Sequence, residues 1–375
     1  MIKYFYCTRN IVGLILVISP LAGFLYIDYS FTLSMIFFCA LTVGVLLGSA
    51  CYELIHFRLW TCFASIAACI GALLLHSDDI LYSDEVIRII GIASIGLYAG
   101  GLAVIVPANL LISWFRVSKT LLMGIVFSIS IILGRFIGIF VERYTYPALA
   151  LSLALMITGT VFFLQRPPQF FSAALLCDDS LFKSVKRPAV IKLFIFVLAV
   201  SFTTGLSFFS QDDTQTFAFF ISNEDVFILG LAAGALGAGL LSEFKGAYSG
   251  CILMIFLAEL TVFSFGERSF ALYTYIVSFS QGLFLSAMMT VIPITVYYIY
   301  GPGGYNRCLS KVWAAYPLGL SAGGTVYALT AGISDDGFFS PQAAQACLMI
   351  LLIACFFTIF STWKHRFVIL KRSRK

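Results

Sequence analysis

Charged side chains are scarce in this sequence of 375 residues. Lys, Arg, Asp and Glu together make up 11% of it, and 61% of the residues are hydrophobic. An average soluble protein is about 25% charged, so these charges are too few to cover a water-facing surface. Lipid is therefore expected to be the solvent for most of the exterior. The chain is predicted to be an all-α integral membrane protein.

The residues of common catalytic and metal sites are also scarce. The three histidines, His56, His76 and His365, lie near predicted membrane faces and far apart in the sequence, and no H-E-x-x-H motif occurs. The P-loop pattern and the glycine fingerprint of dinucleotide-binding folds are missing too. None of the ten cysteines falls in a predicted outer loop, so no extracellular disulfide framework is implied. The sequence predicts neither an enzyme nor a metal or cofactor site.

Long apolar runs, in contrast, are abundant. Hydropathy divides the chain into twelve segments of a length that suits a helix crossing a hydrocarbon layer of about 30 Å. These segments are residues 10–28, 31–52, 60–76, 88–113, 120–141, 147–164, 189–210, 218–242, 247–265, 270–299, 311–333 and 341–362. The sequence therefore predicts twelve transmembrane helices.

Basic residues are distributed unequally between alternate connections. The side that carries both termini holds 19 of the 23 Lys and Arg, whereas the other side holds Arg88, Arg143 and Arg268. Cytoplasmic loops carry the excess of Lys and Arg in membrane proteins. Both termini are therefore predicted to be cytoplasmic, in a plasma (inner) membrane. The basic tail, 364–375, is expected to meet anionic lipid head groups, and no nucleic-acid partner is indicated.

One long polar stretch, 165–188, divides the predicted helices six and six. It contains three prolines and charges of both signs, so it is predicted to be a cytoplasmic linker. The predicted domains are an N-terminal six-helix bundle, 1–164, and a C-terminal six-helix bundle with the basic tail, 189–375.

The two halves carry similar landmarks. Gly48 ends the second apolar segment and is followed by Glu53, and Gly239 ends the eighth and is followed by Glu243 and Lys245. Two glycines spaced four residues apart also occur in both the fifth and the eleventh segment. Repetition of this kind indicates two related bundles.

The stretch GLLSEFKG, from Gly239 to Gly246, resembles the loop signature G-x-L-x-D-r-x-G of the major facilitator superfamily of secondary transporters. Glu243 takes the acidic position, and Lys245 supplies the basic residue one place later. In the corresponding stretch of the first half, Tyr52 stands in the acidic position. The fold that this resemblance implies is two six-helix bundles joined by a cytoplasmic linker.

The resemblance implies that this turn is a cytoplasmic latch, made in one conformation and broken in the other. Glu243 is predicted at a helix end, where water and nearby helix N-termini can stabilise a carboxylate. An ordinary tight turn with two solvated charges is the alternative that the residues leave open. Small residues are expected to let the eighth segment pack closely on its neighbours, namely Gly230, Gly234, Gly237 and Gly239.

The resemblance also implies a central path lined mainly by the first, fourth, seventh and tenth segments. Pro20, Pro107 and Pro293 interrupt three of these and are expected to bend them. Asn109 and Gln281 are candidates for contact with a solute, and a hydrogen bond to a neighbouring helix is the alternative for each.

Few ionisable residues fall within the predicted spans, where each is costly near the bilayer centre. Arg135, in the fifth segment, is predicted either to bind an anionic group or to pair with an acid of another helix. Asp212 and Asp213 follow the seventh segment and are predicted either to carry protons in the path or to be loop charges. The path segments carry no mid-depth basic cluster of the kind that a sugar phosphate would need.

These observations predict a monomeric secondary transporter that moves a small organic solute by alternating access, with the proton as the candidate coupling ion. A transporter-like sensor or accessory protein, which binds a solute without moving it, is the alternative. The departures of the first-half stretch from the family pattern are the reason for keeping that alternative.

Overall fold

The computed structural model describes residues 2–24, 31–75, 85–115, 118–165, 188–209, 224–262, 271–300 and 305–331. Every element in these ranges is helical, which confirms the all-α prediction for the described part of the chain. The first eleven predicted segments each correspond to one helical run. The twelfth, 341–362, lies outside the described residues.

The elements of the N-terminal half are α1 (Ile2–Phe24), α2 (Phe31–Leu54), α3 (Phe57–Leu75), α4 (Glu85–Ala99), η1 (Gly100–Ile105), α5 (Val106–Trp114), α6 (Lys119–Arg143), α7 (Thr145–Thr158) and η2 (Gly159–Phe163). The π-helical segments η1 and η2 continue α4 and α7 without a break. The elements of the C-terminal half are α10 (Pro188–Phe209), α11 (Glu224–Lys245), α12 (Ala247–Val262), α13 (Ala271–Tyr300) and α14 (Tyr305–Ala331).

The outer surface of the helices suits a lipid environment. Seven helical runs within the described residues are long and apolar enough to cross a bilayer. Large apolar side chains point outward from them, among them Phe63, Phe136 and Phe162, each more than half exposed. Exposed apolar surface on this scale would be a liability in water, whereas lipid solvates it. The protein is therefore an integral membrane protein.

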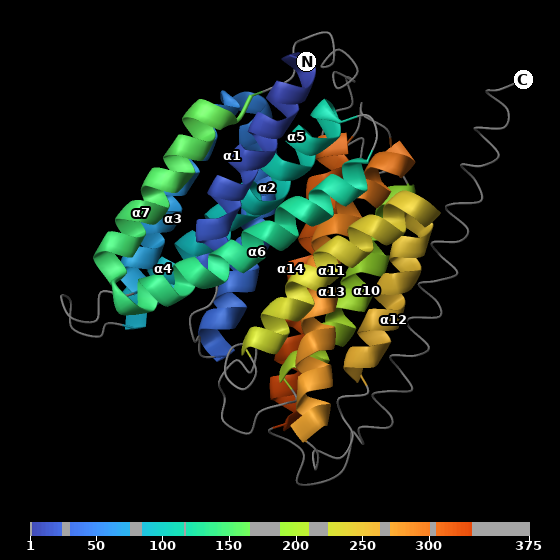
Figure 1. Ribbon diagram of the computed structural model, residues 1–375. Helices are drawn as coiled ribbons and strands as arrows, with labels where there is room; N and C mark the ends of the chain where they lie inside the picture. Colours follow the sequence, from blue (N-terminus) through green and yellow to red (C-terminus); the bar gives the residue numbers. More distant parts are fainter. Residues whose placement is uncertain are drawn as a thin grey trace, which may run out of the picture.

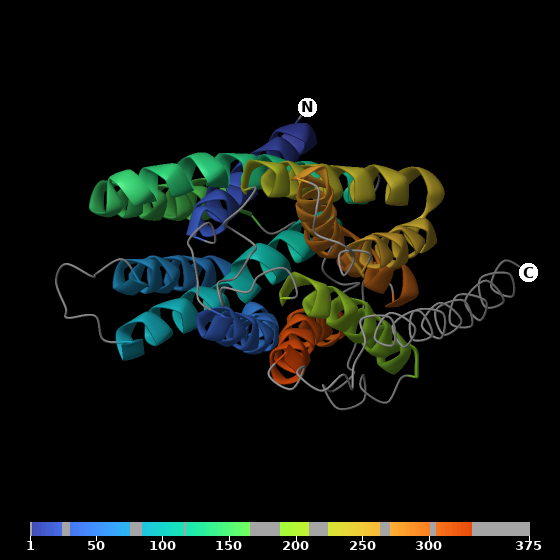
Figure 2. The same cartoon turned by 90° about the horizontal axis from the view of Figure 1, so that it is seen from below.

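The two halves of the chain lie side by side (Figures 1 and 2). Helices α1 to α7, coloured blue to green, form one group, and helices α10 to α14, coloured yellow-green to red, form the other. Two extensive helix pairs join the groups: α6 packs along α11, and α2 packs along α14. We call these pairs the α6–α11 seam and the α2–α14 seam.

Glycines bring equivalent helices into close contact within each half. Gly44 of α2 lies against the backbone of Leu97 in α4, and Gly234 of α11 lies against the backbone of Leu283 in α13. A side chain at either glycine would collide with that backbone, so small residues permit the approach. The expectation of close packing was wrong for Gly237, where an added methyl group would meet no atom of the described residues within 4 Å.

Pro107 coincides with a change of helix type. The π-helical segment η1 ends at Ile105, and Pro107 is the second residue of α5. Proline has no N–H to donate to the carbonyl four residues earlier, and a π-helical turn can accommodate the missing bond. Pro20 and Pro293 lie inside α1 and α13, as does Pro317 inside α14, which the sequence analysis did not single out.

Candidate functional site

The carboxylate of Glu243, near the end of α11, binds the start of α6 in the other half of the chain. The backbone N–H of Ser118 donates to Oε1 of Glu243 at 3.0 Å, and the hydroxyl of Thr120 donates to Oε2. The first N–H groups of a helix have no acceptor within it and favour a negative charge nearby. Ser118 precedes α6 and makes no side-chain cap of its own. Glu243 therefore caps α6 from the opposite half.

Glu53, near the end of α2, makes the corresponding contact with the start of α14. The side-chain amide of Asn306 donates to Oε1 of Glu53 at 2.9 Å, and Nε of Arg307 lies 3.5 Å from Oε2. These are the second and third residues of α14, so this carboxylate also meets a helix N-terminus. Both contacts lie at the end of the molecule where α2 and α11 end, which we call the latch end.

The packing of the glycines brings the two carboxylates into register. Glu53 follows Gly44 by nine residues, as Glu243 follows Gly234, and the two glycines make equivalent contacts. In this alignment Glu53, rather than Tyr52, takes the acidic position of the first half. The alignment made from the sequence was shifted by one residue, because glycines are frequent enough in both helices to permit more than one match.

Asn306 belongs to a buried hydrogen-bond network that joins three helices. It accepts a hydrogen bond from the amide of Asn109 in α5 at 2.9 Å. It also donates to the backbone carbonyl of Ser49 in α2 at 3.3 Å, as well as to Glu53. The Asn109 amide donates a second bond, to the carbonyl of Ile105 at 2.8 Å. Of the two alternatives for Asn109, the structure shows contact with another helix, because both of its donor hydrogens are used within the protein.

Two lysines at the latch end have different surroundings. The ammonium of Lys119, the first residue of α6, lies 3.8 Å from the ring centroid of Tyr297 in α13, a cation–π contact between the halves. Lys245 is exposed at the end of α11. Gly246 follows it with φ of 86°, a left-handed conformation that suits a helix C-terminus. Within the motif the acid thus touches the opposite half, whereas the base points outward.

Arg135 pairs with an acid toward the other end of the α6–α11 seam. Its Nη2 lies 3.6 Å from Oδ1 of Asp225, the second residue of α11. The Arg135 side chain is 20% exposed, whereas that of Asp225 is 86% exposed. Of the two alternatives for Arg135, anion binding and an ion pair between helices, the structure shows the ion pair.

Because Asp225 is so exposed, this ion pair is expected to contribute little stability. Asp225→Asn should lower the free energy of unfolding by less than about 1 kcal/mol, as is usual for pairs in contact with solvent. The measurement is reversible unfolding in mixed micelles, with Glu142→Gln, an exposed acid near the end of α6, as the control. A loss of several kcal/mol would contradict the expectation and would indicate a desolvated pair.

Gln281 and the two aspartates complete the predicted path residues. Gln281 in α13 is buried, and its Nε2 has no hydrogen-bond acceptor within the described chain. Asp212 and Asp213 lie outside the described residues. The structure thus brings Asn109 to the latch end and Arg135 to the far part of the α6–α11 seam, so these two residues do not lie together.

The buried polar side chains of the described residues are all neutral, being Ser, Thr, Asn and Gln. Many of the buried hydroxyls donate to a carbonyl one turn earlier in their own helix, as Thr203, Thr204 and Ser286 do. The hydrogen of each such hydroxyl is therefore already used in a hydrogen bond within its own helix. The described interior therefore offers no buried ionised group to a charged solute.

The partners of the two carboxylates could not be identified from the local sequence patterns. They are Ser118, Thr120, Asn306 and Arg307. Polar residues of these types also occur elsewhere near the predicted helix ends, so none stood out locally. One signal was present nevertheless. The partners stand at the starts of the fifth and the eleventh segments, the two that share a pair of spaced glycines. A comparison of those two starts would have identified them.

No protein-family model matches the sequence, and no curated protein matches it. Solved structures, however, match over nearly the whole chain. The crystal structure of the fucose:proton symporter FucP of E. coli matches with a TM-score of 0.57 at 12% identity, over 96% of this chain and 98% of that one. The crystal structure of the human organic anion transporter MFSD10 matches with a TM-score of 0.60 at 13% identity, over 95% and 99%. At these identities the likeness concerns the fold alone.

Proposed function

We propose, from the premise that the chain has the fold of the major facilitator superfamily, that it is a secondary transporter for a small organic solute. The two moving units would be the bundles 1–164 and 189–375, joined by the linker 165–188. They would rock about a central site so that it opens to each side of the membrane in turn. The protein would act as a monomer.

One observation carries this proposal, namely the pair of equivalent contacts at the latch end. Each half supplies one carboxylate, Glu53 or Glu243, and each half supplies the helix start that the carboxylate of the opposite half contacts. Contacts that serve only to stabilise one bundle would stay within it. These two instead join the bundles at one end, where they would keep the path closed on that side.

The distribution of charge supports an orientation for these contacts. The latch end is the side to which the sequence assigns most Lys and Arg, including Arg58, Lys119, Lys245 and Arg307. By the positive-inside rule it would face the cytoplasm, together with both termini. Closed latches would then belong to the state that opens toward the outside.

Opening the latch end requires Glu243 to leave the start of α6. The N–H of Ser118 and the hydroxyl of Thr120 would then exchange the carboxylate for water. Ser118 has φ of 58°, a left-handed conformation that is unfavourable for serine. Relaxation of that residue would offset part of the free energy lost with the bonds. The two states could therefore differ by only a few kcal/mol, as alternating access requires.

The proposal predicts saturable uptake by the purified protein in liposomes. A panel of small organic solutes is offered with and without an inward pH gradient, and protein-free liposomes are the control. Uptake that saturates with solute concentration supports a carrier. Saturable binding without uptake of any bound solute contradicts transport and supports the sensor as the function.

Coupling to protons is tested on the same liposomes. Asp212→Asn and Asp213→Asn are expected to make uptake insensitive to the pH gradient if these residues carry the proton. Unchanged proton-driven uptake would exclude them. Glu53 and Glu243 would then be the next candidates, because their carboxylates contact the opposite half at the latch end.

A further inference from the structure

Trp313 in α14 is fully buried, yet its indole N–H has no acceptor among the described residues. Buried donors in proteins are nearly always paired, and one without a partner calls for an explanation. Trp114 shows the usual arrangement, since its indole N–H donates to the backbone carbonyl of Gln165 at 2.6 Å. A donor left open inside a transporter is available to a bound solute.

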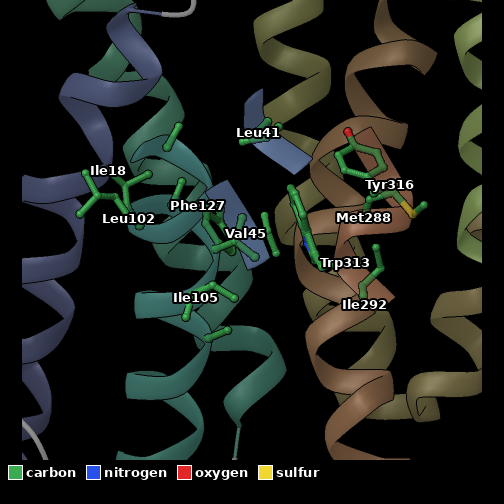
Figure 3. Packing of buried hydrophobic residues seen from close by; sticks show 14 of the residues in the cluster. Ile18, Leu41, Val45, Leu102, Ile105, Phe127, Met288, Ile292, Trp313 and Tyr316 are labelled. Carbon is green, nitrogen blue, oxygen red and sulfur yellow. The ribbon is translucent and has the colours of Figure 1, made fainter. Parts of the chain in front are cut away.

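Trp313 lies where the two halves of the chain face each other. Figure 3 shows its ring between the C-terminal helices and the α2 residues Leu41 and Val45 of the N-terminal half. The ring of Tyr316 meets it edge to face, with the centroids 5.1 Å apart. Ile292 and Met288 of α13 flank the pair (Figure 3). The surroundings of the indole N–H are therefore apolar and aromatic, and both halves contribute to them.

The polar group of Tyr316, beside Trp313, already has a hydrogen-bond partner. The hydroxyl of Tyr316 donates to the carbonyl of Leu285 at 3.4 Å. The fully buried polar residues of the described chain are neutral, so an organic anion would find no fully buried counter-charge there. A sugar would need a partner for each of several hydroxyl groups, whereas the Trp313 side chain supplies one free donor.

We propose that Trp313 is the hydrogen-bond donor of a solute site between the halves, and that the solute is neutral and largely apolar with a hydrogen-bond acceptor. The apolar body would lie against Tyr316, Ile292 and Val45, and its acceptor would take the indole N–H. This inference rests on the proposed function, because it assigns a solute class to the same carrier. It differs from the solutes that the two structural neighbours are named for, fucose and organic anions.

Four probes that share a benzene ring test the solute class. N,N-dimethylbenzamide is neutral and has a strong acceptor, and tert-butylbenzene is similar in shape without an acceptor. Benzoate is an anion, and phenyl glucoside carries several hydroxyl groups. Binding of each labelled probe is measured by equilibrium dialysis to the full-length protein in lipid nanodiscs, and partition into empty nanodiscs is subtracted. The amide is expected to bind most tightly.

Trp313→Phe keeps an aromatic ring but removes the donor. It is expected to weaken binding of the amide about three- to tenfold, the effect of one hydrogen bond to a neutral partner. Binding of tert-butylbenzene should stay unchanged. Trp60→Phe is the matched control. Trp60 is also buried, and its indole N–H has no acceptor within the described ranges, but its ring packs against Gly101 inside the N-terminal half. This control should leave binding of every probe unchanged.

Several outcomes would overturn the inference. They are tighter binding of benzoate or phenyl glucoside, no saturable binding of the amide, or an amide affinity that Trp313→Phe leaves unaltered. Failure of the proposed transport function would give a different set of results from failure of the proposed solute class. If the amide binds through Trp313 but no solute is taken up into liposomes, the site stands and transport is refuted. If a charged solute is taken up and the amide does not bind, transport stands and the solute class is refuted.

Discussion

The double replacement of Glu53 and Glu243 by Gln is expected to speed the reaction of Cys308 with a thiol reagent roughly 30- to 160-fold. Cys308 is buried at the start of α14, close to Asn306 and Arg307. A reagent can reach it only when the latch end opens. Gln keeps the shape of each side chain but removes the charge that the helix start and its donors favour.

The size of the effect follows from the contacts that are lost. A hydrogen bond to a charged group contributes about 1.5–3 kcal/mol, and one to a neutral group about half of that. The loss is therefore about 1–1.5 kcal/mol for each latch. Two latches that oppose the same opening add up to about 2–3 kcal/mol when they act independently. The open population, and with it the rate of modification, rises by the corresponding factor.

The measurement uses a protein in which the other cysteines are replaced by serine, with the reagent applied in nanodiscs. Each single replacement should give part of the increase. Glu142→Gln, the same substitution at the far end of α6, should give none. An unchanged rate in the double variant would show that the two carboxylates do not hold the latch end closed.

Gly239→Leu is expected to abolish uptake, because Gly239 lies in the contact between the halves. A methyl group there would sit 2.8 Å from the carbonyl oxygen of Thr120 and 3.2 Å from Cα of Gly124, both in α6. These are backbone atoms, so the α6–α11 seam must separate to accept a side chain. Separation would also pull Glu243, one turn further along α11, away from the start of α6. Overpacking costs about 1–3 kcal/mol, so the ratio of closed to open protein should fall about fivefold to 160-fold.

The movement is measured as the distance between spin labels on Leu59 and Phe244. Both are exposed residues at the latch end, one in each half. Gly239→Leu should lengthen that distance and abolish uptake. Gly237→Leu is the control in the same helix, because an added methyl group there meets no described atom within 4 Å. Equal effects of the two variants would refute a specific role for the seam.

The helices themselves could be predicted from the sequence, because each apolar run carries its own signal. A run such as 120–141 needs no knowledge of the rest of the chain to be identified as a span, and α6 covers it. The position of Glu243 at a helix end followed in the same way from the glycines and charges around it. These are properties of short stretches of sequence. They are easy to recognise in a membrane protein, because a segment that crosses lipid must be apolar and must satisfy its own backbone hydrogen bonds.

Pairings between distant residues could not be predicted from the same patterns. Asn109 and Asn306 are 197 residues apart, and nothing close to either one indicates the other. Arg135 had two reasonable partners in principle, and only the packing of α6 along α11 brings Asp225 to it. The unpartnered N–H of Trp313 is likewise a property of the assembled interior. What each side chain touches is decided by the tertiary arrangement.

The reciprocal arrangement of Glu53 and Glu243 has a consequence for how the halves join. Each half has a helix that ends near a glutamate and a helix whose first residues donate hydrogen bonds. The glutamate of each half accepts a hydrogen bond from the helix start of the other half. This is the geometry of an isologous dimer, in which one patch is complementary to itself about a twofold axis. A surface of this kind is able to join two copies of the same helical bundle.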